Sequence, residues 1–108
     1  MGVLLTDLKL QDGSTTGNGN AADMSGQSEY VTIYAFGTGT ISSGSLIIEE
    51  AHASTYNGTW SQLSTVSCTA VSTAVQAIHL QGNFKFIRAR ISNNVSGGGN
   101  ITVHLVAD

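Results

Sequence analysis

Few residues in this chain of 108 could do chemistry, and the three histidines are the first candidates as metal ligands. Metal sites need several ligands that converge, often at H-x-H or C-x-x-C spacing. His52, His79 and His104 fall on different expected strands, and the sequence contains neither spacing. We therefore expect no metal site and interpret the histidines as solvent-facing or interface residues.

Cys68, the single cysteine, could act as a thiol nucleophile if a neighbouring base activated it. The flanking Ser67 and Thr69 offer no such activation, and no helix N-terminus is expected nearby to lower the thiol pKa. We interpret Cys68 as a small buried hydrophobic residue on a strand. A single cysteine also excludes an intramolecular disulfide.

Glu49 and Glu50 are the only adjacent carboxylates. Neighbouring residues on a strand point to opposite faces, so this pair cannot share the work of acid–base catalysis. We expect one of them to lie inward at a sheet rim, paired with Arg88 or Arg90, and the other to face solvent. The glycine-rich stretches 17–20 and 97–99 lack the lysine and the strand–loop–helix context of a phosphate loop. The sequence thus predicts no enzyme, metal or cofactor.

The composition indicates a protein that packs against neighbours. Charged residues make up 10% of the chain and the net charge is -3, whereas an average domain has about 25% charged residues. Nucleic-acid binding needs clustered cations, so we exclude nucleic acid as a partner. No apolar run approaches the roughly 20 residues of a membrane helix, and no signal peptide is recognisable. We therefore expect no membrane partner, and synthesis in the cytosol of the protein's own cell or of a host. Thirteen glycines without proline favour the unfolded chain, which suggests an oligomer or assembly that stabilises the fold.

Residues 84–91 (Phe-Lys-Phe-Ile-Arg-Ala-Arg-Ile) show the clearest structural pattern. The alternation places Lys85, Ile87, Ala89 and Ile91 on one side and Phe84, Phe86, Arg88 and Arg90 on the other. A period of two is typical of a β-strand with two different faces. Three of the four basic residues lie on this one strand.

The rest of the chain also predicts strands, over residues 3–10, 29–36, 45–53, 66–71, 74–80 and 101–106, with a short segment at 59–63 around Trp60. Residues 70–78 could instead form a short helix, although their Thr, Ser and Val content favours a strand. Residues 11–28 are expected to form a long loop, and Asn57-Gly58 and 96–100 to form turns. Seven or eight short strands predict an all-β, antiparallel two-sheet sandwich of jelly-roll type. We expect one domain over 1–108, with an N-terminal arm and loop at 1–28.

Three segments together resemble small β-sandwich proteins of tailed-phage structural modules. They are Leu46-Ile47-Ile48-Glu49-Glu50-Ala51 followed by residues 56–63 with Asn57-Gly58-Thr59-Trp60, then residues 82–91 with Phe84-Lys85-Phe86-Ile87-Arg88-Ala89, then residues 98–105. This chain departs from the phage modules at Ala51 and His52, near the place where such modules often have Ser. The layout is also similar to the discoidin-like jelly roll, although no acidic calcium-binding loop is evident. The resemblance covers about residues 45–106. It implies that Trp60 sits over the core and that Ile87, Ala89 and Ile91 line it.

The resemblance implies a non-enzymatic structural role in a virion, with capsid decoration (cement) as the leading interpretation. The partners would be the major capsid protein or other virion proteins, and copies of the chain in a homo-oligomer. The edge strand at 3–10 would pair across an interface by strand addition. The predicted interface residues are Val3, Leu5, Leu8, Leu10, Arg88 and Arg90.

The alternative function is a glycan-binding module of a phage tail or fibre. Aromatic faces can stack on sugars, so Tyr56 and Trp60 could form an exposed platform, with Tyr30 as a third candidate. This hypothesis requires that the Trp60 ring is open to solvent.

Overall fold

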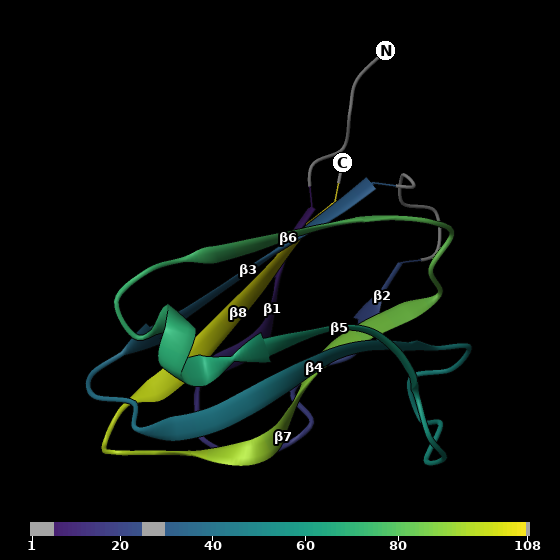
Figure 1. The fold of residues 1–108 in the computed structure, drawn as a ribbon. Coiled ribbons are helices and arrows are strands. Elements are labelled where there is room, and N and C mark those ends of the chain that lie inside the picture. Colours follow the sequence, from purple (N-terminus) through teal and green to yellow (C-terminus); the bar gives the residue numbers. More distant parts are fainter. Residues whose placement is uncertain (1–5, 25–29, 108) are drawn as a thin grey trace.

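The computed structural model describes residues 6–24 and 30–107, which form two four-stranded antiparallel sheets. This confirms the predicted all-β sandwich. The elements are β1 (Thr6–Ser14), β2 (Ala22–Asp23), β3 (Tyr30–Thr38), β4 (Ser43–Ala51), β5 (Ser61–Ser67), the 3-10 turn η1 (Cys68–Val71), β6 (Gln76–Gln81), β7 (Phe86–Ser96) and β8 (Asn100–Ala107) (Figure 1). Among the described residues, no helix has the length and apolar character needed to cross a membrane.

The strand order is that of a jelly roll. One sheet has the order β1-β8-β3-β6 and the other β2-β7-β4-β5. The chain can be described as one long hairpin in which strands from the first half pair with strands from the second half, as β1–β8, β2–β7, β3–β6 and β4–β5. Additional pairing of β3 with β8 and of β4 with β7 rolls this hairpin into two layers (Figure 1). Such nesting brings distant segments together, because the first strand pairs with the last.

The core between the sheets follows the period of two that the sequence predicts. In β8 every second residue, from Ile101 to Ala107, is buried. Ile87, Ala89 and Ile91 of β7 are buried and line the core, as expected. Leu46 and Ile48 of β4 face them across the same sheet and have no exposed surface.

Residues 11–28 do not form the long loop that the sequence predicts. β1 extends to Ser14, Gly17 forms a bridge with Ile91, and Ala22–Asp23 pairs with β7. Of this stretch, residues 25–28 lie outside the described residues. The polar composition of residues 11–20 hid this pairing, because that part is anchored by backbone groups and the Gln11 side chain, and apolar core side chains come only afterwards, at Ala22 and Met24. Residues 6–24 are therefore built into both sheets and do not form a separate arm.

Gln11 holds this segment together across the two layers. The β1–β8 ladder shifts register between Lys9 and Gln11, which turns the Gln11 side chain inward, where it is 3% exposed. Its Nε2 donates to the Ala89 carbonyl at 2.6 Å and to the Gly17 carbonyl at 3.2 Å. Gly19 lies beside it with a φ of +69°, and a Cβ there would meet the Leu10 carbonyl oxygen at 2.1 Å, so only glycine fits.

The segment after β5 departs from the predicted strand at 66–71. β5 ends at Ser67, and η1 buries both Cys68 and Val71 on one side. Two buried residues three positions apart fit the 3-10 period, whereas a strand would point them to opposite faces. Cys68 is therefore a buried apolar residue, as predicted, but not on a strand.

The aromatic start of residues 84–91 also differs from the prediction. β7 begins only at Phe86, and Phe84 packs against the core cluster. Phe84 lies beside Gly82, where an added Cβ would be 3.1 Å from its ring. The alternation expected from Lys85 onward thus holds only inside β7, where hydrogen bonding enforces the pleat.

Candidate functional site

An ionic cluster occupies the outer face of the β2-β7-β4-β5 sheet. Glu49 of β4 lies opposite Arg88 of β7 in the ladder. Arg88 Nε donates to Glu49 Oε2 at 2.6 Å, and Arg90 Nε approaches the same oxygen at 3.2 Å. The Glu49 side chain is 3% exposed, against 14% for Arg88 and 34% for Arg90. One buried carboxylate thus neutralises two of the four basic residues of the chain.

Trp60 covers this cluster. The Arg88 guanidinium carbon lies 4.0 Å from the centroid of the Trp60 ring, a cation–π contact. The indole Nε1 donates to the Tyr56 carbonyl at 2.8 Å, and Trp60 is 4% exposed. Arg88 alternates with the core residues Ile87 and Ala89, so Trp60 packs on the outer face and not over the core. The predicted position over the core is wrong, because the pleat turns the cationic partner of the ring outward.

The exposed aromatic platform of the glycan hypothesis is not formed. Its central ring, Trp60, is buried under Arg88, which leaves Tyr56 with 38% exposure. Tyr30 is 57% exposed but lies on β3 of the other sheet, apart from Tyr56. Tyr56 is tilted against His52 with ring centroids 5.0 Å apart. A single partly exposed tyrosine does not offer the flat surface that a sugar ring stacks on.

Glu50 is separate from the ionic cluster. It lies opposite the buried Ile87, so it is the carboxylate on the core side, half-buried at the rim. The carboxylate that pairs with the arginines is Glu49, on the outer face, whereas the sequence predicted that the paired one would lie inward. Because the two side chains lie on opposite faces of the sheet, they form no acid–base pair.

The three histidines and Cys68 are not brought together. His79 Nδ1 lies 3.1 Å from Thr32 Oγ1, and the His104 ring stacks on Phe36 at 5.9 Å. No group of three metal-ligating residues occurs within residues 6–24 and 30–107. Burial raises the pKa of the Cys68 thiol above its ordinary value of 9.0, because desolvation disfavours the thiolate. The thiol is therefore protonated and poorly nucleophilic at neutral pH.

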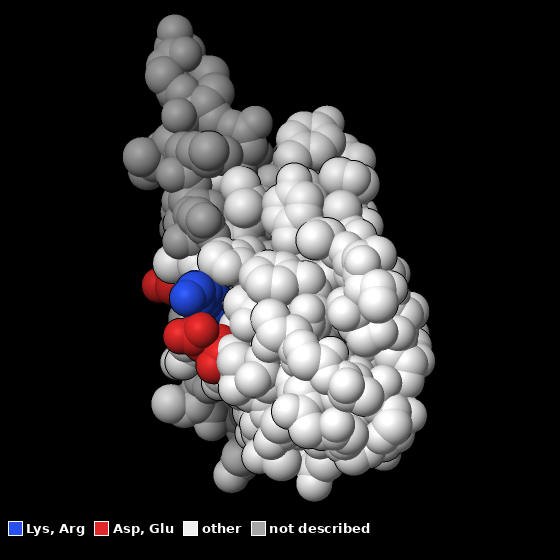
Figure 2. Space-filling view, turned by 90° about the vertical axis from the view of Figure 1, so that its left-hand side faces the viewer, with Lys and Arg blue, Asp and Glu red and all other residues white. Residues whose placement is uncertain are grey.

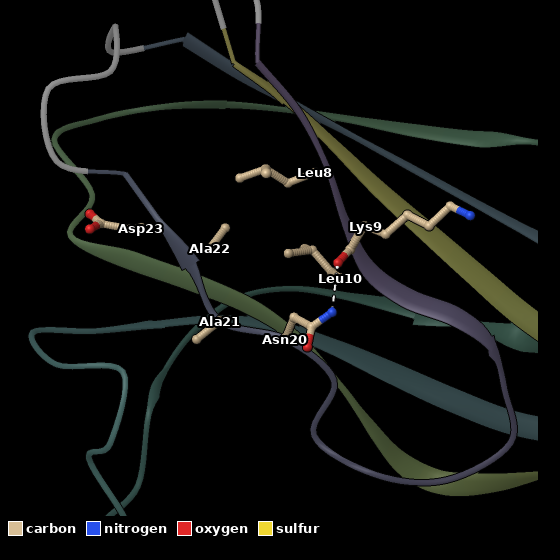
Figure 3. A pocket seen from close by; sticks show the side chains of 7 residues that line it. All are labelled: Leu8, Lys9, Leu10, Asn20, Ala21, Ala22 and Asp23. Atoms are coloured by element: carbon tan, nitrogen blue, oxygen red, sulfur yellow. Dashed lines mark hydrogen bonds between the residues drawn. The ribbon is translucent and has the colours of Figure 1, made fainter.

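An apolar cleft of about 610 Å³ separates the edge strands β1 and β2. Leu8, Leu10 and Ala22 lie between the two strands, and Asn20 closes one side by donating to the Lys9 carbonyl at 3.1 Å (Figure 3). Leu10 has no exposed surface, so it belongs to the core and not to the predicted interface. Leu8 is half-buried against the same core. The other predicted interface leucine and valine, Leu5 and Val3, lie outside the described residues.

The outer face of the β1-β8-β3-β6 sheet has a different character. Tyr30 and Tyr34 of β3 are exposed at 57% and 38%, and they alternate with buried core residues. Thr32, His79 and His104 lie on the same face. Lys9, at the β1 edge, is ion-paired with Asp12 at 3.3 Å. The end of the molecule shown in Figure 2 is almost free of charged side chains, and those in view gather at one margin.

Comparison with known proteins gives a structural likeness but no match in sequence. No model of a known protein family matches the chain, and no curated protein matches it in sequence. The crystal structure of the SPBc2 prophage-derived protein YomS superposes with a TM-score of 0.67 at 13% sequence identity. The superposition covers 95% of this chain and 91% of that one. The two proteins therefore share their fold over nearly their whole length.

Proposed function

We propose that this chain is a non-enzymatic structural protein of a phage particle that decorates and stabilises the assembled shell. The observation that carries the proposal is the shared fold with a prophage-derived protein over 95% of this chain and 91% of the other. The tailed-phage resemblance of residues 45–106 points the same way. The protein would be made in the host cytoplasm and retained in the virion.

The proposed mechanism is contact alone. The face that carries Tyr30 and Tyr34 offers aromatic side chains without a surrounding field of charge, and tyrosine is favoured at protein interfaces. Copies arranged on a symmetric shell would be retained strongly even if each contact were modest, since multivalency raises the effective affinity. The major capsid protein is the proposed partner.

The ionic cluster has a structural role in this proposal. Arg88 and Arg90 are held by Glu49 and so contribute packing of the β4–β7 face. Glycan binding, the other function considered, is less well supported because the Trp60 ring is covered.

The test is the number of copies of this chain in purified particles, measured by quantitative mass spectrometry against the major shell protein. We expect a one-to-one ratio or a simple lattice fraction of it. A handful of copies per particle would move the protein to the tail or fibre, and its absence from the particle would overturn the proposal.

A second measurement addresses binding directly. Purified chain is added to shells that lack it, and the bound fraction is measured by sedimentation. We expect saturable binding that Tyr34→Lys weakens, whereas Thr65→Lys on the opposite sheet leaves it unchanged. Equal binding by all three proteins would exclude the Tyr30–Tyr34 face as the contact.

A further inference from the structure

The four sheet edges of this sandwich differ in how they are protected against pairing with another strand. Natural edge strands are usually blunted by charges, proline, bulges or short length. β1 carries the Lys9–Asp12 ion pair and two register shifts, and β2 has only two residues. β5 has a register shift opposite Ile48 and Glu49.

β6 lacks all of these protections. It pairs with β3 in an unbroken register from Tyr30–Gln81 to Ala35–Gln76. Its sequence, Gln-Ala-Ile-His-Leu-Gln, contains no charged residue and no proline. Within residues 6–24 and 30–107, β3 is its one strand neighbour, and no loop forms a backbone hydrogen bond to its outer side. A row of backbone donors and acceptors is therefore available to another extended strand.

Exposed apolar side chains gather around the same strand. Four large hydrophobic residues are exposed in the described part of the chain, and three of them adjoin β6. Val75 precedes it and is 61% exposed, while Tyr30 and Tyr34 lie opposite Gln81 and Ala77 in the ladder. Clustering of exposed aromatic and apolar residues beside an open edge is typical of an interaction surface.

The sequence of β6 is complementary to itself in one antiparallel register. Opposed residues of antiparallel strands point to the same face. A two-fold axis must therefore lie at one residue of the strand, and not between two residues, if core-facing side chains of one copy are to oppose core-facing side chains of the other. An axis through His79 places Ile78 opposite Leu80 of the second copy, and Leu80 opposite its Ile78. Both residues already pack against the core, so this register continues the core across the junction. An axis through Ile78 would instead oppose Leu80 to the polar Gln76.

We propose that β6 pairs with β6 of a second copy about a two-fold axis at His79, joining two four-stranded sheets into one of eight strands. On the outer face, Tyr34 of one copy and Tyr30 of the other would flank the junction over Ala77 and Gln81. This pairing stands independently of the proposed phage function, since it concerns the isolated chain.

Cysteine cross-linking tests both the pairing and its register. Directly opposed residues in an antiparallel pair have Cα atoms about 4.5–5.5 Å apart, within the disulfide range of about 4.4–6.8 Å. His79→Cys should therefore form a disulfide-linked dimer under mild oxidation. Ala77→Cys is the matched control on the same strand and face; its distance from its own copy would be about 14 Å, so it should stay unlinked. The native Cys68 is buried and does not compete.

Sedimentation equilibrium of the unmodified chain, from low micromolar to several hundred micromolar, gives an answer even if a variant fails to fold. We expect a reversible dimer. The dissociation constant of this dimer should increase at least tenfold in His79→Glu, because the substitution places two carboxylates at the axis. Thr65→Glu on the β5 edge should leave dimerisation unchanged. A strictly monomeric chain, equal cross-linking of both cysteine variants, or loss of the dimer only in Thr65→Glu would each overturn the proposal.

Discussion

The outer faces of the two sheets use the same fold in opposite ways. On the β2-β7-β4-β5 face, Arg88 and Arg90 converge on a buried Glu49, and Trp60 covers them. On the β1-β8-β3-β6 face, Tyr30 and Tyr34 stand exposed among threonines and histidines. In both sheets the outward-facing residues alternate with residues of the same core. The alternation of the strands therefore does not explain why one face is ionic and the other aromatic.

The two faces differ in how they use the few charges of the chain. With charged residues at 10% of the chain, placing two arginines on one internal carboxylate leaves little charge for the rest of the surface. The first face is thus satisfied within the chain, and the second is left neutral and aromatic. Substitutions on the first face should therefore cost more stability than substitutions on the second.

The largest effect is expected at Trp60. Trp60→Ala removes a buried indole and uncovers Arg88, which should lower the free energy of unfolding by about 3–5 kcal/mol. Tyr34→Ala, on the other face, should change it by less than about 1 kcal/mol because that side chain is exposed. Chemical denaturation of both variants measures the contrast. Equal losses would show that the two faces do not differ in packing.

The next effect concerns the carboxylate. Glu49→Gln leaves two arginines beside each other without a countercharge, and we expect a loss of about 2–3 kcal/mol, since removing one partner of a buried ion pair is strongly destabilising. Arg90 keeps 34% exposure, which limits the loss. Glu50→Gln is the matched control at the rim, expected to cost less than about 1 kcal/mol. A larger loss of stability in Glu50→Gln than in Glu49→Gln would contradict the assignment of Glu49 as the carboxylate that stabilises the fold.

The link between the layers should have a smaller effect. Gln11→Ala leaves the Ala89 carbonyl and the Gly17 carbonyl without their side-chain donor, at a cost of about 1–3 kcal/mol. The exposed Gln62→Ala on β5 should be nearly neutral. Hydrogen exchange would localise the effect, with faster exchange expected at the Ile91 amide, which donates to Gly17. If the Ile91 amide exchanged at the same rate in Gln11→Ala as in the unmodified chain, the Gln11 side chain would not be what anchors residues 15–20.

The smallest effect is a pH dependence at Cys68. Burial raises the pKa of this thiol above 9.0, so the unfolded chain ionises first as the pH rises. The stabilising contribution is complete below pH 9.0 and is lost as the pH rises toward the pKa of the folded state. The free energy of unfolding should therefore fall more between pH 8 and pH 10 in the unmodified chain than in Cys68→Ala. Parallel pH profiles would contradict the assignment.

The sequence predicted the fold because the fold rests on alternation. Buried and less buried positions alternate throughout β8 and in β7 from Phe86 to Ile91, and turn residues separate the two strands, so pattern alone indicates two packed sheets. The strand order depends on which distant segments pair, and no local pattern carries that information. The pairing of residues 15–23 with β7 escaped prediction for the same reason, since it uses backbone groups of a polar segment.

The candidate site was predictable in its members but not in its geometry. Ionic pairing of a glutamate with Arg88 or Arg90 follows from their types and strand positions, but its location depends on register. Opposite Arg88 stands Glu49 and not Glu50, and a slip of one residue would have exchanged them. Trp60 reaches the outer face through the 52–60 segment, whose path no periodicity specifies. The spacing of Cys68 and Val71 was the one overlooked signal, since it fits a 3-10 turn.

Nesting of the strands also has a topological consequence, since Thr6 and Ala107 are ladder partners at the open end of the rolled hairpin (Figure 1). A polypeptide fused before β1 and one fused after β8 would leave the sandwich at the same point and in the same direction. A short linker could join these ends into a ring, with new termini opened in the exposed segment between β4 and β5. The fold is thus suited to circular permutation. In a fusion protein, the added polypeptide would project away from the turn between β3 and β4.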